Sequence, residues 1–444
     1  MKQRLFATSK QHPDGHFMLA VVFRRARPFI RALIATGDKT ALRTQAEQNS
    51  PLAPAQLLIY RLPGGAEYVK IHGMKLFMIA GEKSGDKQGA LLIKELLRRN
   101  PDIEIVGLGG SRMHALAPGV EDWAEQAAVI GFVEVLKHAR FFLRRLKDMA
   151  TRIEQEQPDG LILIDYPGFN QRLAERVHKS CPKTKIAWFI APMVWAWHKS
   201  RVPKLASILD LMMCTFPFEK PLFEAAGLRT EFVGHPLVDD ILEQRRTDVR
   251  EKGLIGLFPG SRMREIERHF PVFLEVVKKL QTVHPEWRYE TSASSEKLAA
   301  IMRRMAEKAG VSPELINICP GSYHGLMDRA EAALVASGTA TLEAALHELP
   351  FALVYKVAWG TYMFGRMILT IKHIGMVNIL IDKAVTKELI QNDFNVENCI
   401  AELEKLTTPE TRAEVLAGMK ESMDRLGHGG AAAKAADAVM SLFE

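Results

Sequence analysis

Cysteine is scarce in this sequence, and the few cysteines lie far apart. A chain of 444 residues holds only Cys181, Cys214, Cys319 and Cys399, with no Cys-x-x-Cys pair among them. This spacing argues against both a zinc site and a disulfide framework. A reducing cytoplasm is the compartment that fits such a chain best.

The first 73 residues also lack a membrane-spanning or secretory segment. Their most apolar part, residues 17–23, is short and runs into Arg24, Arg25, Arg27 and Arg31. A bilayer-spanning helix needs about 20 apolar residues, so this run cannot cross a membrane. No small-residue cleavage site follows a proper apolar core, so a secretory signal is not expected.

Charge of one sign is in excess only in that same segment. Residues 1–73 hold 11 Lys and Arg against 4 Asp and Glu, which accounts for the whole net charge of +7. The rest of the chain is neutral, so a global basic surface for nucleic acid is not supported. We expect residues 1–73 to be an upstream extension outside the fold. The alternative is a basic segment that touches membrane lipid.

From residue 74 onward, short apolar runs alternate with helical stretches. This alternation predicts an α/β fold of two Rossmann-like parallel-sheet domains that face each other across a cleft, with ligands at the carboxyl ends of the strands. We expect a first domain over 74–240, a second over 250–400, and C-terminal helices over 401–444 that either cross back or pair with another subunit in a homodimer. The expected strands are 75–80, 103–108, 160–164, 185–190 and 211–216 in the first domain, and 254–258, 289–292, 316–319 and 333–336 in the second.

The stretch 333–345 shows the clearest local pattern. An apolar run is followed by the polar turn Ser337-Gly338-Thr339 and then by good helix formers. A strand, a small-residue turn and a helix start place unpaired N–H groups and a positive dipole end at one point, which suits a phosphate. Thr341 adds a hydroxyl, and Glu343 could accept hydrogen bonds from ribose hydroxyls. The alternative is an ordinary strand-to-helix turn with a capping Ser or Thr.

A second strand, turn and helix start follows residues 254–258. The turn consists of Pro259, Gly260, Ser261 and Arg262. The Arg262 guanidinium can pair with a diphosphate.

Polar residues also follow two strands of the first domain. Glu82, Ser84 and Asp86 come after the strand at 75–80, and Asp165 comes directly after the strand at 160–164. A carboxylate at a strand end that faces the crevice is well placed as a general base. Spacing alone supports a helix-capping role for Asp165 equally well.

The loop at 191–201 contains Trp195 and Trp197 close to three potentially cationic side chains. Two interpretations stand side by side. The tryptophans either pack the loop internally or form a wall for an amphiphilic ligand.

Residues 131–149 predict a basic amphipathic helix. Phe142 falls on its apolar face, while Arg144 and Arg145 lie among the basic residues of the other face. Such helices can lie on an anionic membrane surface. Packing on the protein's own domain is the other interpretation.

Eight short motifs follow one another along the chain. In chain order they are Ile79–Asp86, Ile130–Leu136, Ile164–Asn170, Val194–Trp197, Phe216–Glu219, Phe232–Pro236, Pro259–Arg262 and Val335–Glu343. Taken together, these motifs resemble those of the lipid-A-disaccharide synthase family, over residues 74 to about 430. The resemblance does not include the N-terminal extension.

This resemblance implies an inverting glycosyltransferase with the GT-B fold. Members join UDP-2,3-diacylglucosamine to 2,3-diacylglucosamine 1-phosphate (lipid X), as peripheral proteins on the cytoplasmic face of the inner membrane. The first domain would then serve the acceptor and the second the UDP-sugar. The resemblance also assigns Asn378, Glu388 and Gln391 to the donor site, although Val377 and Lys387 stand where the family usually has Pro.

The sequence has no Asp-x-Asp, the metal-binding pair of many nucleotide-sugar enzymes. We therefore expect no metal and no other cofactor, with helix N-termini and Arg262 neutralising the leaving diphosphate. Asp165 is the favoured base, and Glu82 is its competitor. Two rival functions remain: another GT-B enzyme, such as an N-acetylglucosaminyltransferase or a UDP-sugar epimerase, and a non-catalytic UDP-sugar sensor at the membrane.

Overall fold

The computed structural model describes residues 57–61, 67–71, 73–124, 134–197, 199–246, 249–368 and 371–444. The chain divides into two units, Met1–His72 and Gly73–Glu444. Within the first unit, β1 (Leu57–Arg61) and β2 (Glu67–Ile71) pair as an antiparallel two-stranded sheet. No strand was expected within residues 1–73.

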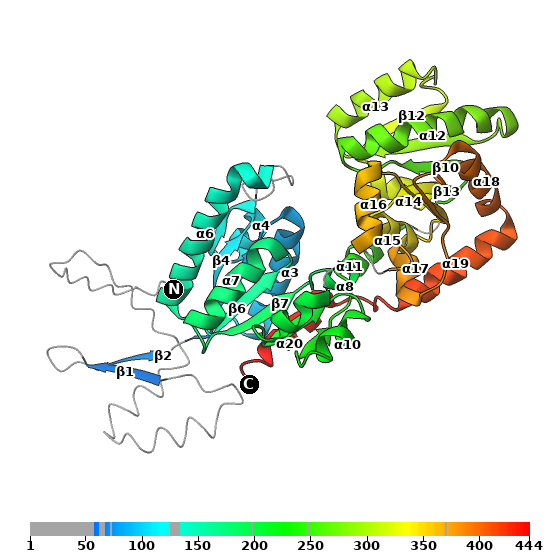
Figure 1. Cartoon of the computed structure of the whole chain (residues 1–444). Coiled ribbons are helices and arrows are strands. Elements are labelled where there is room, and N and C mark those ends of the chain that lie inside the picture. The colour runs from blue at the N-terminus through cyan, green and yellow to red at the C-terminus, as the bar shows by residue number, and fades with distance from the viewer. Residues whose placement is uncertain are drawn as a thin grey trace, which may run out of the picture. The chain divides into compact units, whose positions relative to one another are not determined.

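The first half of the second unit contains a seven-stranded parallel sheet with strand order β5-β4-β3-β6-β7-β8-β9 (Figure 1). The order reverses between β3 and β6, because the chain first adds strands on one side of β3 and then on the other. Ligands of open parallel sheets bind at such a reversal. The strands are β3 (Lys75–Ala80), β4 (Glu104–Gly109), β5 (Gly119–Asp122), β6 (Gly160–Ile164), β7 (Lys185–Phe189), β8 (Leu211–Cys214) and β9 (Thr230–Phe232).

Helices cover both faces of this sheet, so its central strands are mainly apolar, and β6 and β8 are buried along their whole length. Phe77 and Ile79 of β3 belong to the core on one face, and Met78 belongs to the core on the other. The helical segments are α3 (Lys83–Arg99), α4 (Ser111–Leu116), α6 (Glu134–Glu156), α7 (Pro167–Ser180), α8 (Val194–Trp197), η1 (Lys199–Arg201), α9 (Val202–Ala206), α10 (Glu219–Glu224) and α11 (Pro236–Leu242).

The second half contains a six-stranded parallel sheet with strand order β12-β11-β10-β13-β14-β15. Its order reverses between β10 and β13. The two sheets with their helices confirm the predicted α/β class. The strands are β10 (Glu251–Phe258), β11 (Arg288–Ala293), β12 (Ile316–Pro320), β13 (Ala330–Ala336), β14 (Phe351–Tyr355) and β15 (Glu388–Ile390).

The helices of this half include the two that follow the strands at the reversal, α12 (Met263–Val283) after β10 and α15 (Thr339–Leu346) after β13. Each therefore begins at the edge where a ligand is expected. The others are α13 (Glu296–Lys308), α14 (Tyr323–Arg329), α16 (Trp359–Ile368), α17 (Met376–Ile381), α18 (Val396–Leu406) and α19 (Pro409–Asp424).

The last helix, α20 (Ala431–Met440), returns to the first half of the chain. Its Ala435 and Val439 are buried in the same core as β3 and α3. The Arg99 side chain of α3 pairs with Asp437 at 2.6 Å and donates to the carbonyl of Ala433 at 2.7 Å. Of the two arrangements expected for the C-terminal helices, the structure therefore shows crossing back within one chain.

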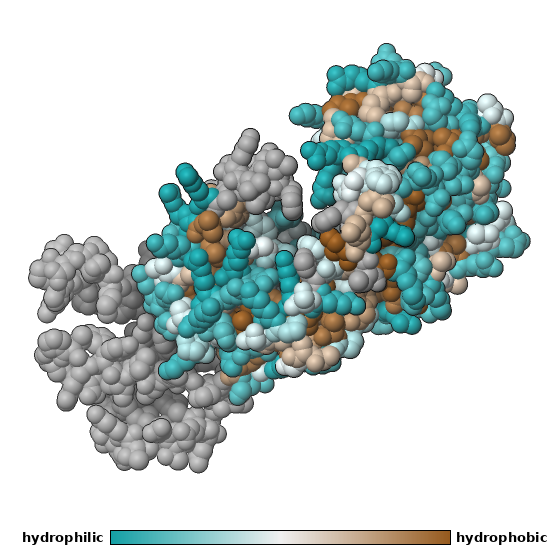
Figure 2. Space-filling model, viewed as in Figure 1, coloured by the Kyte–Doolittle hydropathy of each residue, from teal (hydrophilic) through white to brown (hydrophobic). Residues whose placement is uncertain are grey.

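Hydrophilic residues cover most of the described surface on the face seen in Figure 2, and hydrophobic residues form separate patches on it. Among the residues that the structure describes, no helix is both long and apolar enough to cross a membrane.

Candidate active site

The strand reversal of the first sheet brings two predicted carboxylates to one edge. Ala80, the last residue of β3, pairs with Ile164, the last residue of β6. Glu82 follows the first strand by two residues, and Asp165 follows the second directly. Glu82 is exposed and Asp165 is partly buried, and the two are close enough for their charges to interact.

Asp165 and Tyr166 both adopt left-handed backbone conformations, with φ of 46° and 51°. Non-glycine residues rarely occupy this region, and each such residue costs of order 1–3 kcal/mol. The buried Asn170 side chain holds the turn, since its amide donates to the carbonyls of Ile164 at 3.2 Å and Asp165 at 2.7 Å. The turn ends in α7, whose N-cap residue is Tyr166 and not Asp165.

Burial raises the pKa of the Asp165 carboxyl above its ordinary value. The backbone N–H of Tyr166 opposes this shift, and the charge of Glu82 adds to it. A carboxylate with a raised pKa binds a proton more readily, which is what a general base must do. Burial also raises the pKa of the Tyr166 hydroxyl, to about 12.

Aromatic rings pack beside this pair around Trp123, a residue that was not predicted from any motif. Trp123 is buried, and its indole N–H donates to the carbonyl of Ala80 at 2.7 Å, which fixes the end of β3. Its ring centroid lies 5.2 Å from Phe169, 5.9 Å from Tyr166 and 6.3 Å from Phe142. Phe142, on the apolar face of the predicted amphipathic helix, is thus half-buried against Trp123.

Asp86 and Ser84, the other polar residues after β3, lie in different environments. Asp86 is buried, and its carboxylate accepts from the backbone N–H groups of Gly110 at 2.8 Å, Met113 at 3.0 Å and Arg112 at 3.1 Å. It therefore holds the start of α4 against α3. Ser84 is exposed in the first turn of α3.

The two tryptophans of the 191–201 loop also differ. Trp195 is buried against Phe218, with ring centroids 4.9 Å apart, and its indole donates to the buried Glu219 at 3.1 Å. Burial raises the pKa of Glu219 to about 8. Trp197 is 48% exposed, with the Arg201 guanidinium 5.8 Å from the centre of its ring. The packing interpretation suits Trp195, and the surface-wall interpretation suits Trp197.

The predicted amphipathic helix is α6, of which residues 131–133 and the side chains of 134–139 lie outside the described residues. The motif at 130–136 also lies outside the described residues, except for the backbone of residues 134–136. Arg144 is exposed, whereas Arg145 pairs with Glu121 at 3.1 Å. Leu143, between Phe142 and Arg144, is half-exposed.

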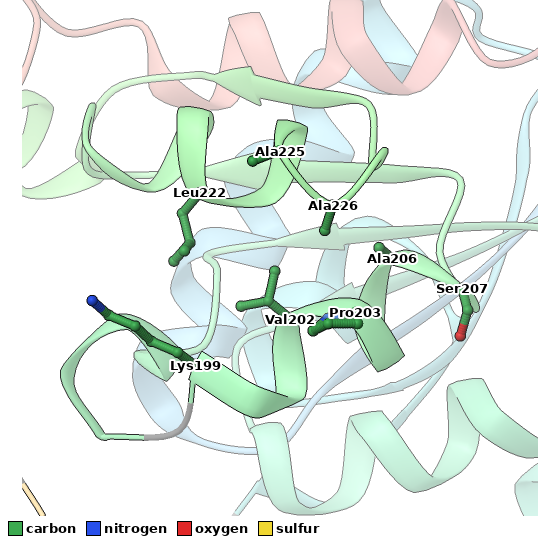
Figure 3. A pocket seen from close by; sticks show the side chains of 8 residues that line it. All are labelled: Lys199, Val202, Pro203, Ala206, Ser207, Leu222, Ala225 and Ala226. Atoms are coloured by element: carbon green, nitrogen blue, oxygen red, sulfur yellow. The ribbon is translucent and has the colours of Figure 1, made fainter.

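A shallow groove with a volume of about 430 Å³ lies between α9 and α10 (Figure 3). Small apolar side chains form most of its lining, with Lys199 on one side. The lining residues are Lys199, Val202, Pro203, Ala206, Ser207, Leu222, Ala225 and Ala226.

In the second sheet, the reversal places the two predicted phosphate turns side by side, because Phe258 of β10 pairs with Val335 of β13. Gly260 has φ of +109°, and a Cβ there would lie 2.3 Å from a Glu265 oxygen, so only glycine fits. Glu265 accepts from the N–H groups of Ser261 at 3.0 Å and Arg262 at 3.1 Å. The Arg262 side chain is 83% exposed and contacts Glu265 at 3.2 Å.

The turn after β13 is open. Gly338 is the N-cap of α15, and a Cβ at Gly338 would meet no atom within 4 Å. Thr339 is exposed and Ser337 is partly buried. Thr341 is buried, and its hydroxyl donates to the carbonyl of Gly338 at 2.8 Å, so it stabilises the turn itself.

Glu343 is hydrogen-bonded to Tyr323, a residue that was not predicted to belong to the site. The Tyr323 hydroxyl donates to Glu343 at 2.7 Å. Burial raises the pKa of Tyr323 above its ordinary value, and the charge of Glu343 adds to this shift. This contact fixes the orientation of the Glu343 carboxylate at the edge where the ribose was expected.

His269, also unmarked in the sequence, joins two strand-end loops. It is buried, with Nδ1 at 2.7 Å from the carbonyl of Pro259, and its Nε2 accepts from the backbone N–H of Lys356 at 3.1 Å. These partners require a proton on Nδ1 and none on Nε2. Burial lowers the pKa of His269, which keeps this neutral form.

The three residues assigned by resemblance all have protein partners. Asn378 is fully buried and donates to Glu388 at 2.9 Å, and Glu388 also accepts from the N–H groups of Ile374 and Gly375. Gln391 exchanges two hydrogen bonds with the backbone of Val357, at 2.8 and 3.2 Å. Val377 is buried and Lys387 is exposed, at the two positions that depart from the family pattern.

Within the described residues, no group of three or more His, Cys, Asp or Glu side chains is arranged to hold a metal ion.

The fold is shared with solved nucleotide-sugar enzymes. A protein assigned as UDP-N-acetylglucosamine 2-epimerase from Listeria monocytogenes superposes with a TM-score of 0.59 at 15% identity, covering 84% of this chain and 97% of that one. The calicheamicin glycosyltransferase CalG4 superposes with a TM-score of 0.51 at 15% identity, covering 83% and 98%. The fold is therefore that of GT-B glycosyltransferases and UDP-sugar epimerases.

Sequence comparison identifies the family of this chain within that fold class. The family model for lipid-A-disaccharide synthetase matches residues 76–439. The lipid-A-disaccharide synthase of Geobacter sulfurreducens is 35% identical over 383 residues, which cover 83% of this chain and 97% of that relative. The chain belongs to the lipid-A-disaccharide synthase family, and it is a glycosyltransferase of lipid A biosynthesis.

Proposed function

We propose that the chain transfers 2,3-diacylglucosamine from UDP to the 6-hydroxyl of 2,3-diacylglucosamine 1-phosphate (lipid X). The products are the β-1,6-linked lipid A disaccharide 1-phosphate and UDP. Family membership supports this reaction. The observation that carries the catalytic part is the partly buried Asp165 carboxylate, held by a strained turn at the strand reversal of the first sheet.

In the proposed reaction, Asp165 takes the proton from the acceptor 6-hydroxyl while that oxygen attacks the anomeric carbon of the donor. The bond between this carbon and the diphosphate breaks on the opposite face, and its electron pair leaves with UDP. The configuration is thereby inverted. The charge of Glu82 raises the proton affinity of Asp165, and Glu82 is also the alternative base.

The turns after β10 and β13 are proposed to bind the donor. The N–H groups of Thr339 and Ala340, at the start of α15, have no partner inside their helix and lie next to Gly338, where a Cβ would meet no atom within 4 Å. The N–H of Thr341 donates instead to the carbonyl of Gly338 at 3.2 Å. The exposed Arg262 guanidinium can pair with the diphosphate, as can the hydroxyls of Ser337 and Thr339. Glu343 accepts from the ribose hydroxyls. The solved fold neighbour named for UDP-N-acetylglucosamine is consistent with a UDP-sugar ligand.

Gly260, Ser261, Thr341, Asn378, Glu388 and Gln391 are assigned to shaping the donor site. Their hydrogen bonds or backbone conformations fix the surrounding loops. On the acceptor side, Asp86 and Trp195 position the loops, and Ser84 and Trp197 are the more exposed candidates for contact.

We infer that the protein works peripherally on the cytoplasmic face of the inner membrane, because both substrates carry acyl chains. The exposed Arg144 and the half-exposed Leu143 of α6 are suited to an anionic lipid surface. Reversing the charges of Arg144 and Arg145 should weaken pelleting with anionic liposomes. Unchanged pelleting would reject α6 as the anchor.

The decisive experiment incubates the full chain with both diacylated sugars and identifies the product by mass spectrometry. The expected product is the disaccharide 1-phosphate, with UDP released only when the diacylated acceptor is present. Product from N-acetylglucosamine acceptors, or epimerised donor, would favour the other GT-B enzymes. Binding of the UDP-sugar without turnover would favour a sensor.

A further inference from the structure

A second groove, with a volume of about 270 Å³, lies on the other side of α9, between α7 and the η1–α9 segment. Its chemistry is the opposite of that of the apolar groove in Figure 3. Charged and polar side chains dominate its lining. The lining residues are Pro167, Gly168, Gln171, Arg172, Glu175, Arg201 and Lys204.

The charges in this groove do not balance. Glu175 is its one carboxylate, and it pairs with Lys204 at 2.6 Å and accepts from Gln171 at 3.1 Å. Within the described part of the chain, neither Arg172 nor Arg201 has a carboxylate within ion-pair distance. Arg201 instead lies over the Trp197 ring. Two uncompensated guanidinium groups therefore line one small groove.

The groove begins beside the proposed base. Pro167 lines it and follows Asp165 by two residues, so their Cα atoms are at most about 7.6 Å apart. A sugar whose hydroxyl reaches Asp165 can therefore extend a substituent from another ring position into the groove.

We propose that this groove binds the phosphate group of the acceptor, with Arg172 and Arg201 as its ligands. This inference rests on the proposed function, in which the acceptor carries a phosphate. Guanidinium groups present paired N–H donors that match phosphate oxygens. The volume is below that of a drug-sized site but suits one small anionic group.

The groove in Figure 3 supports this assignment. Val202, Pro203 and Ala206 of α9 line that apolar groove, while Arg201 and Lys204, from η1 and α9, line the basic one. The acceptor is an amphiphile with a phosphate and acyl chains. The two sides of α9 thus offer the two kinds of surface that such a molecule requires.

The test compares two acceptors, 2,3-diacylglucosamine with and without its 1-phosphate. Arg172→Gln and Arg201→Gln should each raise KM for the phosphorylated acceptor by about 10- to 100-fold, since each removes a charged hydrogen bond. The kcat and the KM for the unphosphorylated acceptor should stay within about threefold. Arg201→Lys keeps the charge but not the paired N–H donors, so its KM for the phosphorylated acceptor should lie between those of the wild type and Arg201→Gln.

Arg176→Gln is the matched control, because Arg176 is exposed one turn further along α7 and does not line the groove. It should behave as wild type. The proposal would be overturned if Arg172→Gln and Arg201→Gln raised KM equally for both acceptors, or raised it for neither.

A binding measurement separates this inference from the proposed function. Calorimetry with detergent-dispersed lipid X and the Asp165→Asn chain, with or without Arg201→Gln, needs no turnover. Weaker binding in the Arg201→Gln chain supports the groove even if the wild type forms no disaccharide. Unchanged binding refutes the groove even if the wild type is active.

Discussion

Gly81→Ala should reduce catalysis by displacing the turn that holds Asp165. A Cβ at Gly81 would lie 2.3 Å from Cγ of Tyr166 and 2.4 and 2.5 Å from its two Cδ atoms. Ordinary contact begins at 3.4 Å, so the Tyr166 ring must retreat by about 1.1 Å, the difference between 3.4 and 2.3 Å. The ring cannot do so alone, since it packs against Trp123 and Phe169.

The size of the expected loss of activity follows from this displacement. Overpacking of this kind costs roughly 1–3 kcal/mol of stability, which a domain of this size tolerates. Asp165 immediately precedes Tyr166 in the strained turn, so its carboxylate moves with the ring. A misplacement of about 1 Å in an active site can cost on the order of 10²-fold in rate. We therefore expect kcat to fall about 10²-fold in a chain that remains folded.

The assay is steady-state UDP release with both diacylated sugars, together with urea denaturation. Gly360→Ala serves as the control, because a Cβ at Gly360 meets no atom within 4 Å and the residue is exposed in α16. It should be active and at least as stable as wild type, since alanine suits a helix better than glycine. A folded Gly81→Ala chain with activity within threefold of wild type would refute the reasoning.

Four further substitutions test other residues. Asp165→Asn should lower kcat by roughly 10²-fold or more. Glu82→Gln should move the acidic limb of the pH–rate profile to lower pH, because it removes a charge that raises the pKa of Asp165; a loss as large as that of Asp165→Asn would make Glu82 the base instead. His269→Ala should destabilise the chain by roughly 2–4 kcal/mol in urea, since two backbone groups lose their buried partner. Burial lowers the pKa of His235 from 6.5 to about 4, so only the unfolded chain takes up this proton between those values. The free energy of unfolding should therefore decrease by up to about 3 kcal/mol as the pH falls from 6.5 to 4. The substitution His235→Gln should remove this pH dependence.

Local patterns were enough to predict the α/β class and the strand ends that carry the site. Strands buried on both faces of a parallel sheet are continuous apolar runs, and these are visible without any partner. The runs before Asp165, Gly260 and Ser337 all became strands next to a reversal of strand order. The short strands β5, β9 and β15, of four, three and three residues, were not predicted, because their pairing depends on a neighbouring strand and not on their own sequence. Strand β14 was also missed, although Phe351–Tyr355 is an apolar run that its own sequence could have indicated.

Only the tertiary structure decided which of the marked residues face a ligand site and which hold the fold. Asp86 and Asn378 resemble site residues in the sequence, yet their side chains are buried and hydrogen-bonded to backbone groups of neighbouring loops. Conversely, Trp123, His269 and Tyr323 have no motif around them. The partners of Trp123 and Tyr323 lie 43 and 20 residues away along the chain, and the two partners of His269 lie 10 and 87 residues away. A hydrogen bond between such positions leaves no periodic trace in the sequence. It arises only when the strands bring their ends to one edge of a sheet.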